Sequence, residues 1–347
     1  GLVRCSGKGG ALVWEYNSGF MAANVRPVLG KGDHAPALLA AAVTDGVACL
    51  DAASGAERWR LPLGVVGVGG LGWTHLDGTG ALALVADLGE AIVALDEDGN
   101  ELWRFDGRGL SAPLKVTRAL AAADVNGDDT AEIFACAGTD VFSLDPQGQL
   151  RWNVAADAEI VSAPVVADTE EDGIFEVFAV LADGSVTALD SDKGDVLWRS
   201  ADALPALETG WLALGDFNWD RKPEVVAAGG GTVALSLADG TRLWSVAVGK
   251  EPVTGICVAD LDGDTGLEIL AACGDGSLVL LEESGEVGMV ASANVSVAGP
   301  PAVGDFDGNG TVDMLAGGKS FSCMDTGAAL LASALAWPQA RFDGGNT

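Results

Sequence analysis

Acid-rich loops recur five times in this chain, and each places oxygen-bearing side chains at its first, third, fifth and ninth positions. Alternate spacing in a tight turn directs these oxygens toward one centre. Carboxylates gathered so closely repel one another unless a cation neutralises them, and Ca²⁺ accepts six to eight oxygen ligands in a flexible geometry. The sequence therefore predicts several calcium sites. The expected ligands are Asp124, Asn126, Asp128 and Glu132; Asp168, Glu170, Asp172 and Glu176; Asp216, Asn218, Asp220 and Glu224; Asp260, Asp262, Asp264 and Glu268; and Asp305, Asp307, Asn309 and Asp313.

The same loops have a second interpretation, because Asp, Asn and Gly also form turns that their own backbone satisfies without an ion. Five loops in one register, each closing with an acid, favour calcium. The loop that begins at Asp168 fits least well, since Glu170 is longer than the third residue of the other loops.

Two more loops occupy the same place in the repeat but have lost most of their acids, and they hold both histidines of the protein, His34 and His75. Histidine acts as a general base or a metal ligand near neutral pH. One interpretation is sequence drift, with His75 as a turn residue. The other is a site built from the two histidines. Together with Tyr16, they are the candidate catalytic residues.

A connection before the third repeat is basic, although the chain as a whole is strongly acidic. An arginine cluster beside an aromatic residue suits a sugar that carries carboxylate or sulfate groups. Salt bridges to the acidic surface are the alternative. With the equivalent connections included, the candidate ligand-binding residues are Arg26, Arg104, Arg108, Lys115, Arg118, Glu208, Trp211 and Lys250.

These residues must be positioned by a repeated element, which is marked by a glycine followed four residues later by a large apolar residue. The period is about 45 residues, as in propeller arrays. In the copy at residues 161–202, four short strands alternate with Asp- and Gly-containing turns. We expect each tryptophan of the motif to wedge between adjacent blades. The pairs are Gly10/Trp14, Gly55/Trp59, Gly99/Trp103, Gly148/Trp152, Gly194/Trp198, Gly240/Trp244, Gly285/Met289 and Gly327/Leu331.

One four-stranded sheet cannot cover both of its faces, whereas radial stacking of several sheets buries them. We therefore predict an all-β fold, a single seven-bladed β-propeller of four-stranded antiparallel blades over residues 1–347. Eight Gly/Trp-type pairs leave an eight-bladed ring as the alternative. Residues 1–17 are expected to close the ring by pairing with C-terminal strands. The blades are expected near residues 26–64, 68–107, 116–157, 161–202, 208–249, 253–294 and 297–333, followed by a tail, 334–347.

Two family resemblances interleave along nearly the whole chain. The loops Asp260–Asp264 and Asp305–Asn309 resemble the calcium loops of FG-GAP/VCBS repeats, and segments Ala94–Trp103 and Ala188–Trp198 resemble PQQ-type quinoprotein repeats. The resemblance implies a propeller with calcium loops. It says little about function, because this architecture hosts enzymes, lectins and adhesion scaffolds. No PQQ is expected, since the chain has neither a vicinal cysteine pair nor a convincing set of catalytic aspartates.

The composition narrows the choice of partner and compartment. A formal net charge of −31 argues against nucleic acid, whose phosphates need clustered Lys and Arg. No apolar run is long enough to span a bilayer. Cys257 and Cys273 flank one predicted hairpin, where either a disulfide or two buried free thiols fit. The chain opens at Gly1 without Met, so a signal peptide could have been removed, and we expect a secreted, periplasmic or cell-surface protein.

Three functions fit these patterns. The leading one is a secreted, calcium-stabilised propeller that binds a ligand, a glycan or a protein without chemistry. The second is a polysaccharide lyase acting on an acidic glycan, with Tyr16, His34 or His75 as base and acid, and Arg108 or Arg118 neutralising the carboxylate. Segment Asp239–Trp244 resembles strands of such lyases. The third is a structural component of an extracellular layer or filament.

Overall fold

The structure is a computed structural model, and it describes residues 2–5, 12–16, 23–29, 36–43, 46–62, 70–111, 113–114, 119–205, 207–293, 296–317 and 321–329. Within these ranges, every helix or strand is a β-strand. The chain divides into two compact units. One unit contains β1 to β14 and the turn Asp192–Gly194, and the other contains β15 to β29.

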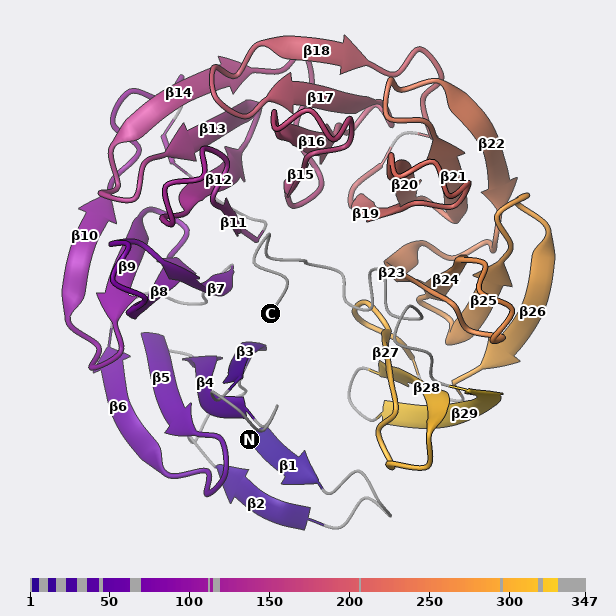
Figure 1. Cartoon of the computed structure of the whole chain (residues 1–347), viewed down its shortest axis with the longest axis horizontal. Helices are drawn as coiled ribbons and strands as arrows, with labels where there is room; N and C mark the ends of the chain where they lie inside the picture. Colours follow the sequence, from indigo (N-terminus) through magenta and orange to yellow (C-terminus); the bar gives the residue numbers. More distant parts are fainter. Residues whose placement is uncertain are drawn as a thin grey trace. The chain divides into compact units, whose positions relative to one another are not determined.

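The first unit contains a two-stranded sheet followed by three four-stranded sheets, and all neighbouring strands are antiparallel (Figure 1). The two-stranded sheet pairs β1 (Leu2–Cys5) with β2 (Leu12–Tyr16). The others are β3 (Ala23–Leu29), β4 (Pro36–Val43), β5 (Gly46–Asp51) and β6 (Glu57–Pro62); β7 (Leu71–His75), β8 (Leu82–Asp87), β9 (Ile92–Asp96) and β10 (Glu101–Phe105); and β11 (Ala121–Ala123), β12 (Glu132–Ala137), β13 (Asp140–Leu144) and β14 (Leu150–Ala155).

The second unit repeats the same arrangement in three four-stranded sheets and one sheet of three described strands. These are β15 (Val165–Ala167), β16 (Glu176–Val180), β17 (Val186–Asp190) and β18 (Val196–Arg199); β19 (Trp211–Gly215), β20 (Glu224–Gly229), β21 (Thr232–Ser236) and β22 (Arg242–Ala247); β23 (Val253–Ala259), β24 (Glu268–Cys273), β25 (Ser277–Leu281) and β26 (Val287–Ser292); and β27 (Ala302–Gly304), β28 (Thr311–Gly317) and β29 (Phe321–Ala329). The predicted all-β fold of four-stranded antiparallel sheets is confirmed.

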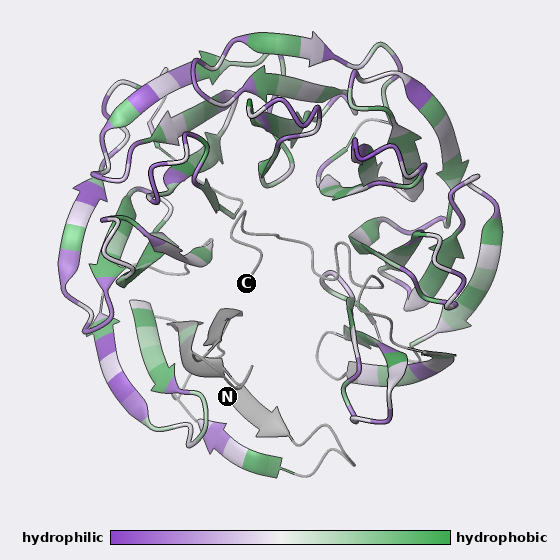
Figure 2. Ribbon diagram, in the orientation of Figure 1, coloured by the Kyte–Doolittle hydropathy of each residue, from purple (hydrophilic) through white to green (hydrophobic). Residues whose placement is uncertain are grey.

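Burial on both faces explains why the second and third strands of the four-stranded sheets are rich in apolar residues. Every residue of β12 and of β20 is buried, because both faces of these strands are covered. The fourth strands are more exposed, as in β22, where exposed and half-buried residues alternate. Figure 2 shows this gradient, with hydrophobic residues gathered on the middle strands and hydrophilic residues in the turns.

Each described tryptophan of the repeat docks on the glycine of the next copy. Six of these glycines have a positive φ, and a Cβ added to any of them would lie 2.5 to 2.8 Å from an indole ring atom. Glycine is therefore required both for the left-handed backbone and for the close approach. The predicted wedge is confirmed, in the pairs Trp14 on Gly55, Trp59 on Gly99, Trp103 on Gly148, Trp152 on Gly194, Trp198 on Gly240 and Trp244 on Gly285.

In four of these tryptophan–glycine contacts, the indole ring also forms a hydrogen bond with the next copy. The indole Nε1 donates to a backbone carbonyl two or three residues before the docked glycine. The bonds are Trp14 to Ala52 (3.1 Å), Trp59 to Glu97 (2.7 Å), Trp103 to Pro146 (2.9 Å) and Trp244 to Glu283 (2.8 Å).

The N-terminal strands β1 and β2 behave like the last two strands of a blade. They pair with each other, and Trp14 docks on the following sheet at Gly55. The sequence predicts that these strands pair with C-terminal strands; among the described residues β1 and β2 pair only with each other, and residues 330–347 are not described, so ring closure stays a prediction.

Candidate functional site

The acid-rich loops share one backbone conformation. In each, the fourth and sixth residues have a positive φ, whether or not they are glycine. The loop after β7, which has lost its first and last acids, has the same conformation at Gly78 and Gly80. The loop backbone therefore does not depend on the acids. The left-handed residues of the five acidic loops are Gly127 and Asp129, Glu171 and Gly173, Trp219 and Arg221, Gly263 and Thr265, and Gly308 and Gly310.

The acid at the ninth position closes each loop. Its carboxylate is buried and accepts a hydrogen bond from the backbone N–H of the second loop residue, in five loops out of five. Burial raises the pKa of four of these acids, Glu132, Glu176, Glu224 and Glu268, the last to about 8. The bonds are Val125 to Glu132 (3.3 Å), Thr169 to Glu176 (2.8 Å), Phe217 to Glu224 (2.8 Å), Leu261 to Glu268 (2.6 Å) and Phe306 to Asp313 (2.9 Å).

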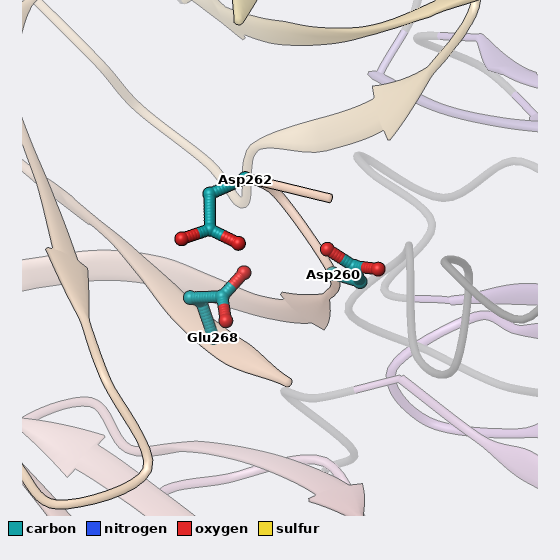
Figure 3. A group of neighbouring side chains, drawn as sticks. All are labelled: Asp260, Asp262 and Glu268. Atoms are coloured by element: carbon teal, nitrogen blue, oxygen red, sulfur yellow. The ribbon is translucent and has the colours of Figure 1, made fainter. Parts of the chain in front are cut away.

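Two loops bring three carboxylates together. One oxygen from each of Asp260, Asp262 and Glu268 lies within 4.8 Å of the others, and Asp305, Asp307 and Asp313 form the same arrangement. Figure 3 shows the carboxylates of Asp262 and Glu268 facing each other, with Asp260 beside them. Desolvation and the charges of Asp262, Glu282 and Asp260 raise the pKa of Glu268, so its charged form is unfavourable without a cation.

In two other loops the ninth acid accepts a hydrogen bond from the amide of the third residue. Asn126 donates from Nδ2 to Glu132 Oε1 (3.0 Å), and Asn218 donates to Glu224 Oε1 (2.8 Å). The third residue is Asp in the two loops that gather three carboxylates. At the third position, Asn therefore donates to the ninth acid, whereas Asp adds a carboxylate to the cluster.

The loop that begins at Asp168 directs its third residue elsewhere. Glu170 forms an ion pair with Lys222 of the next acidic loop, and Thr169 donates to Glu176. Glu170 is therefore engaged between two loops rather than within its own.

One surface feature of these loops was missed by the sequence analysis. Trp219 is 58 % exposed and has a φ of 63°, at a position where three of the four other acidic loops have glycine. Arg221, two residues on, is also left-handed, and Ile174 in the neighbouring loop is exposed. We call Trp219 and Arg221, two exposed residues of one loop, the Trp219 patch. The tryptophan itself was visible in the sequence, but its left-handed backbone was not.

The candidate catalytic residues have separate surroundings. Tyr16 donates from its hydroxyl to Glu57 and accepts a hydrogen bond from Arg60, and burial together with Glu57 raises the pKa of Tyr16. His75 ends β7 and is exposed, and its carbonyl accepts a hydrogen bond from the N–H of Ala131 (2.8 Å). Among the described residues, Tyr16 and His75 share no hydrogen bond. His34 lies outside the described residues.

The described candidate ligand-binding residues belong to both units. Arg104 lies within β10, where it pairs with Glu101 (2.7 Å), and not in the connection that follows. Arg108 is exposed near Asp106. Trp211 begins β19, and its indole donates to the carbonyl of Val253 (3.1 Å), a contact between two sheets. Glu208 and Lys250 are exposed on the second unit. Of Arg26 only the backbone is described, in β3, while Lys115 and Arg118 lie outside the described residues.

Cys257 and Cys273 are buried free thiols. They lie on paired strands, but Cys257 is opposite Leu270 and Cys273 is opposite Val253, so the two sulfurs do not face each other. The disulfide alternative is thereby excluded for this pair. Burial raises the pKa of both thiols.

Comparison with known proteins places these repeats in a family. The sequence profile described as outer membrane protein assembly factor BamB matches residues 1–155 and 123–265, which is more than half of the chain. The chain belongs to this family. No curated protein matches it significantly. The PQQ-like repeats predicted from the sequence are thereby confirmed.

Solved structures show the fold. BamB from Moraxella catarrhalis matches with a TM-score of 0.61 and 19% identity, over 88% of this chain and 83% of that one. The V. cholerae biofilm matrix protein Bap1 matches with a TM-score of 0.66 and 15% identity, over 96% and 83%. BBS1N, solved in complex with ARL6DN, matches with a TM-score of 0.58 and 13% identity, over 91% and 98%. The chain is a β-propeller of four-stranded antiparallel blades. Among the described residues, no helix is long and apolar enough to cross a membrane.

Proposed function

We propose that this protein is a protein-binding propeller of the cell envelope and that the Trp219 patch anchors its partner. The family is described as an outer membrane protein assembly factor, and one structural neighbour was solved in complex with another protein. Both observations support a binding module. The single observation that carries the proposal is the exposed, left-handed Trp219.

A tryptophan at this place is unfavourable for folding. A left-handed backbone costs a non-glycine residue about 1–2 kcal/mol, and an exposed indole buries little area in return. Trp219 and Arg221 both carry this cost in one loop. Strained residues of this kind concentrate at functional sites. Tryptophan and arginine are also the residues that most often dominate protein–protein binding energy.

The variant Trp219→Gly tests the proposal because glycine fits the backbone that tryptophan strains. We expect the variant to fold with equal or higher stability, by about 1 kcal/mol, and to lose its partner. Immobilised wild type and variant are compared for the proteins they retain from an envelope extract of the source organism. Leu243→Ala is the matched control, since Leu243 is 50 % exposed on β22 and lies outside the patch. Equal retention by Trp219→Gly and wild type would refute the proposal.

We further propose that Ca²⁺ occupies the Asp260 and Asp305 loops first. The residues present fit the ion, because each loop gathers three carboxylates and its ninth acid is buried. The loops with Asn126 and Asn218 satisfy their ninth acid by hydrogen bonds, so their need for a cation is smaller. The Asp168 loop is proposed to bind Ca²⁺ after the Asp260 and Asp305 loops, because its Glu170 is paired with Lys222.

Chelation tests the calcium proposal. A ligand bound only by the native state stabilises it by about 2.7 kcal/mol at a concentration one hundred times its Kd. We expect the wild type to show a higher Tm in calcium than in EDTA. The double variant Asp262→Asn, Asp307→Asn copies the third residue of the hydrogen-bonded loops, so its Tm in EDTA should match or exceed that of the wild type, and calcium should raise its Tm less than it raises that of the wild type. An identical Tm of the wild type in calcium and EDTA would contradict the proposal.

A further inference from the structure

The outer edge of the β23–β26 sheet differs from those of the other sheets. β26 carries no charged residue, and four consecutive residues, Val287 to Val290, are exposed, Val290 at 64 %. The other fourth strands in four-stranded sheets each contain an arginine near their tryptophan, and charge on an edge strand discourages pairing with other chains. These arginines are Arg60, Arg104, Arg151, Arg199 and Arg242. β26 lacks that protection.

The contact between a tryptophan and the glycine of the next copy is also missing at β26, among the described residues. Met289 stands where the other copies have tryptophan, and it is 38 % exposed, against 8 % for Trp14 and 9 % for Trp152. Gly327 stands where the docked glycine is expected, with a φ of 76°, and no described atom lies within 4 Å of the position a Cβ would take. Ala291 of β26 and Met324 of β29 pack on one apolar cluster, so the two sheets are neighbours. Among the described residues, neither Met289 nor any other side chain therefore fills the dock at Gly327.

The negative charge around β26 favours a basic binding partner. No Lys, Arg or His occurs between Glu251 and Gly318, whereas Glu282, Glu283 and Glu286 lie at or just before the turn that leads into β26. This negative field attracts a basic segment and repels a second copy of this acidic chain.

We infer that the edge of β26 receives an extended segment of a partner protein, which adds a strand and inserts an aromatic side chain beside Met289, with basic residues facing the three glutamates. This inference rests on the proposed protein-binding function. Addition of a strand gives affinity through main-chain hydrogen bonds and selectivity through the side chains that alternate along it. A residue paired with Met289 shares its face of the sheet, so its side chain enters the unfilled dock.

A peptide probe tests the inference on the full-length protein. The probe has the sequence of residues 241–248, TRLWSVAV, which docks a tryptophan in this same fold, preceded by two lysines. Measured by fluorescence anisotropy, the probe should bind the protein, and its affinity should fall as the salt concentration rises. Replacing the peptide's tryptophan by alanine should weaken binding roughly tenfold or more. No binding of the probe to the wild type would overturn the inference.

Two variants locate the site. Met289→Trp restores the residue that six other copies carry and fills the dock from within, and Val290→Lys places a charge on the exposed edge. Each should weaken probe binding roughly tenfold or more. Unchanged binding of the probe to both variants would overturn the inference. If the wild type is a dimer and Met289→Trp converts it to a monomer, the inference is also overturned, because the edge of β26 then receives a second copy of this chain. Trp219→Gly should bind the probe normally, which separates failure of this inference from failure at the Trp219 patch.

Discussion

At the scale of single residues, the carboxylate of Asp87 makes stability depend on pH. Asp87 is fully buried, its Oδ1 accepts a hydrogen bond from Gly89 (2.6 Å), and its Oδ2 has no hydrogen-bond partner among the described residues. Desolvation raises the pKa of Asp87 to about 7. The folded state therefore binds this proton more tightly than the unfolded state, and the resulting stability is present below about pH 4 and is lost as the pH rises to about 7.

The variant Asp87→Asn tests this dependence because it keeps the acceptor for Gly89 and removes the charge. We expect the variant to be more stable than the wild type at pH 8, on the order of 4 kcal/mol, and nearly equal to it at pH 4. Urea unfolding at the two pH values measures the difference. The same difference at both pH values would show that the charge of Asp87 is not its cause.

The sequence predicted which loop residues recur but not what each residue does. The acid at the ninth position was expected as a metal ligand, and the structure adds a bond from it to the loop backbone, as between Glu268 and Leu261. Asn126 was expected as a ligand, and its amide instead donates to Glu132. Carboxylate and amide occupy the same position in the pattern, and only the geometry tells a donor from an acceptor.

At the scale of the element, the docking of one fourth strand on the next glycine holds neighbouring sheets together. Gly99→Ala should destabilise the protein by about 2–4 kcal/mol, because the new Cβ would lie 2.8 Å from Trp59 at a φ of 84°. Gly80→Ala is the matched control, since Gly80 has a φ of 79° and open space around it. It should cost only about 1–2 kcal/mol for the backbone. Chemical denaturation compares the two, and equal losses would show that the dock contributes nothing beyond backbone strain.

The strands themselves were predictable because hydrophobic runs and Asp–Gly turns alternate so regularly. The Gly-to-Trp spacing also predicted the wedge between sheets. What it could not supply was the direction of docking, in which the tryptophan of one copy packs on the glycine of the next, as Trp103 does on Gly148. A spacing within one repeat carries no information about contacts between repeats.

At the scale of the whole molecule, repetition separates the residues that build the fold from those that depart from it. Tryptophan–glycine docks and loop-closing acids recur in both units and serve packing. Trp219 and Met289 are departures, one adding an exposed aromatic residue and the other removing a buried one. Family membership and the fold account for the residues that recur in each repeat. Binding is proposed at Trp219 and Met289, which differ from the repeat.

Site-specific photocrosslinking at position 219 tests the central claim most directly. A photoreactive phenylalanine analogue replaces Trp219 in one variant and Leu243 in a control, and both are irradiated in intact cells of the source organism. Our account predicts a discrete protein adduct from position 219 and none from position 243. No adduct at position 219, or the same adduct at both positions, would contradict it.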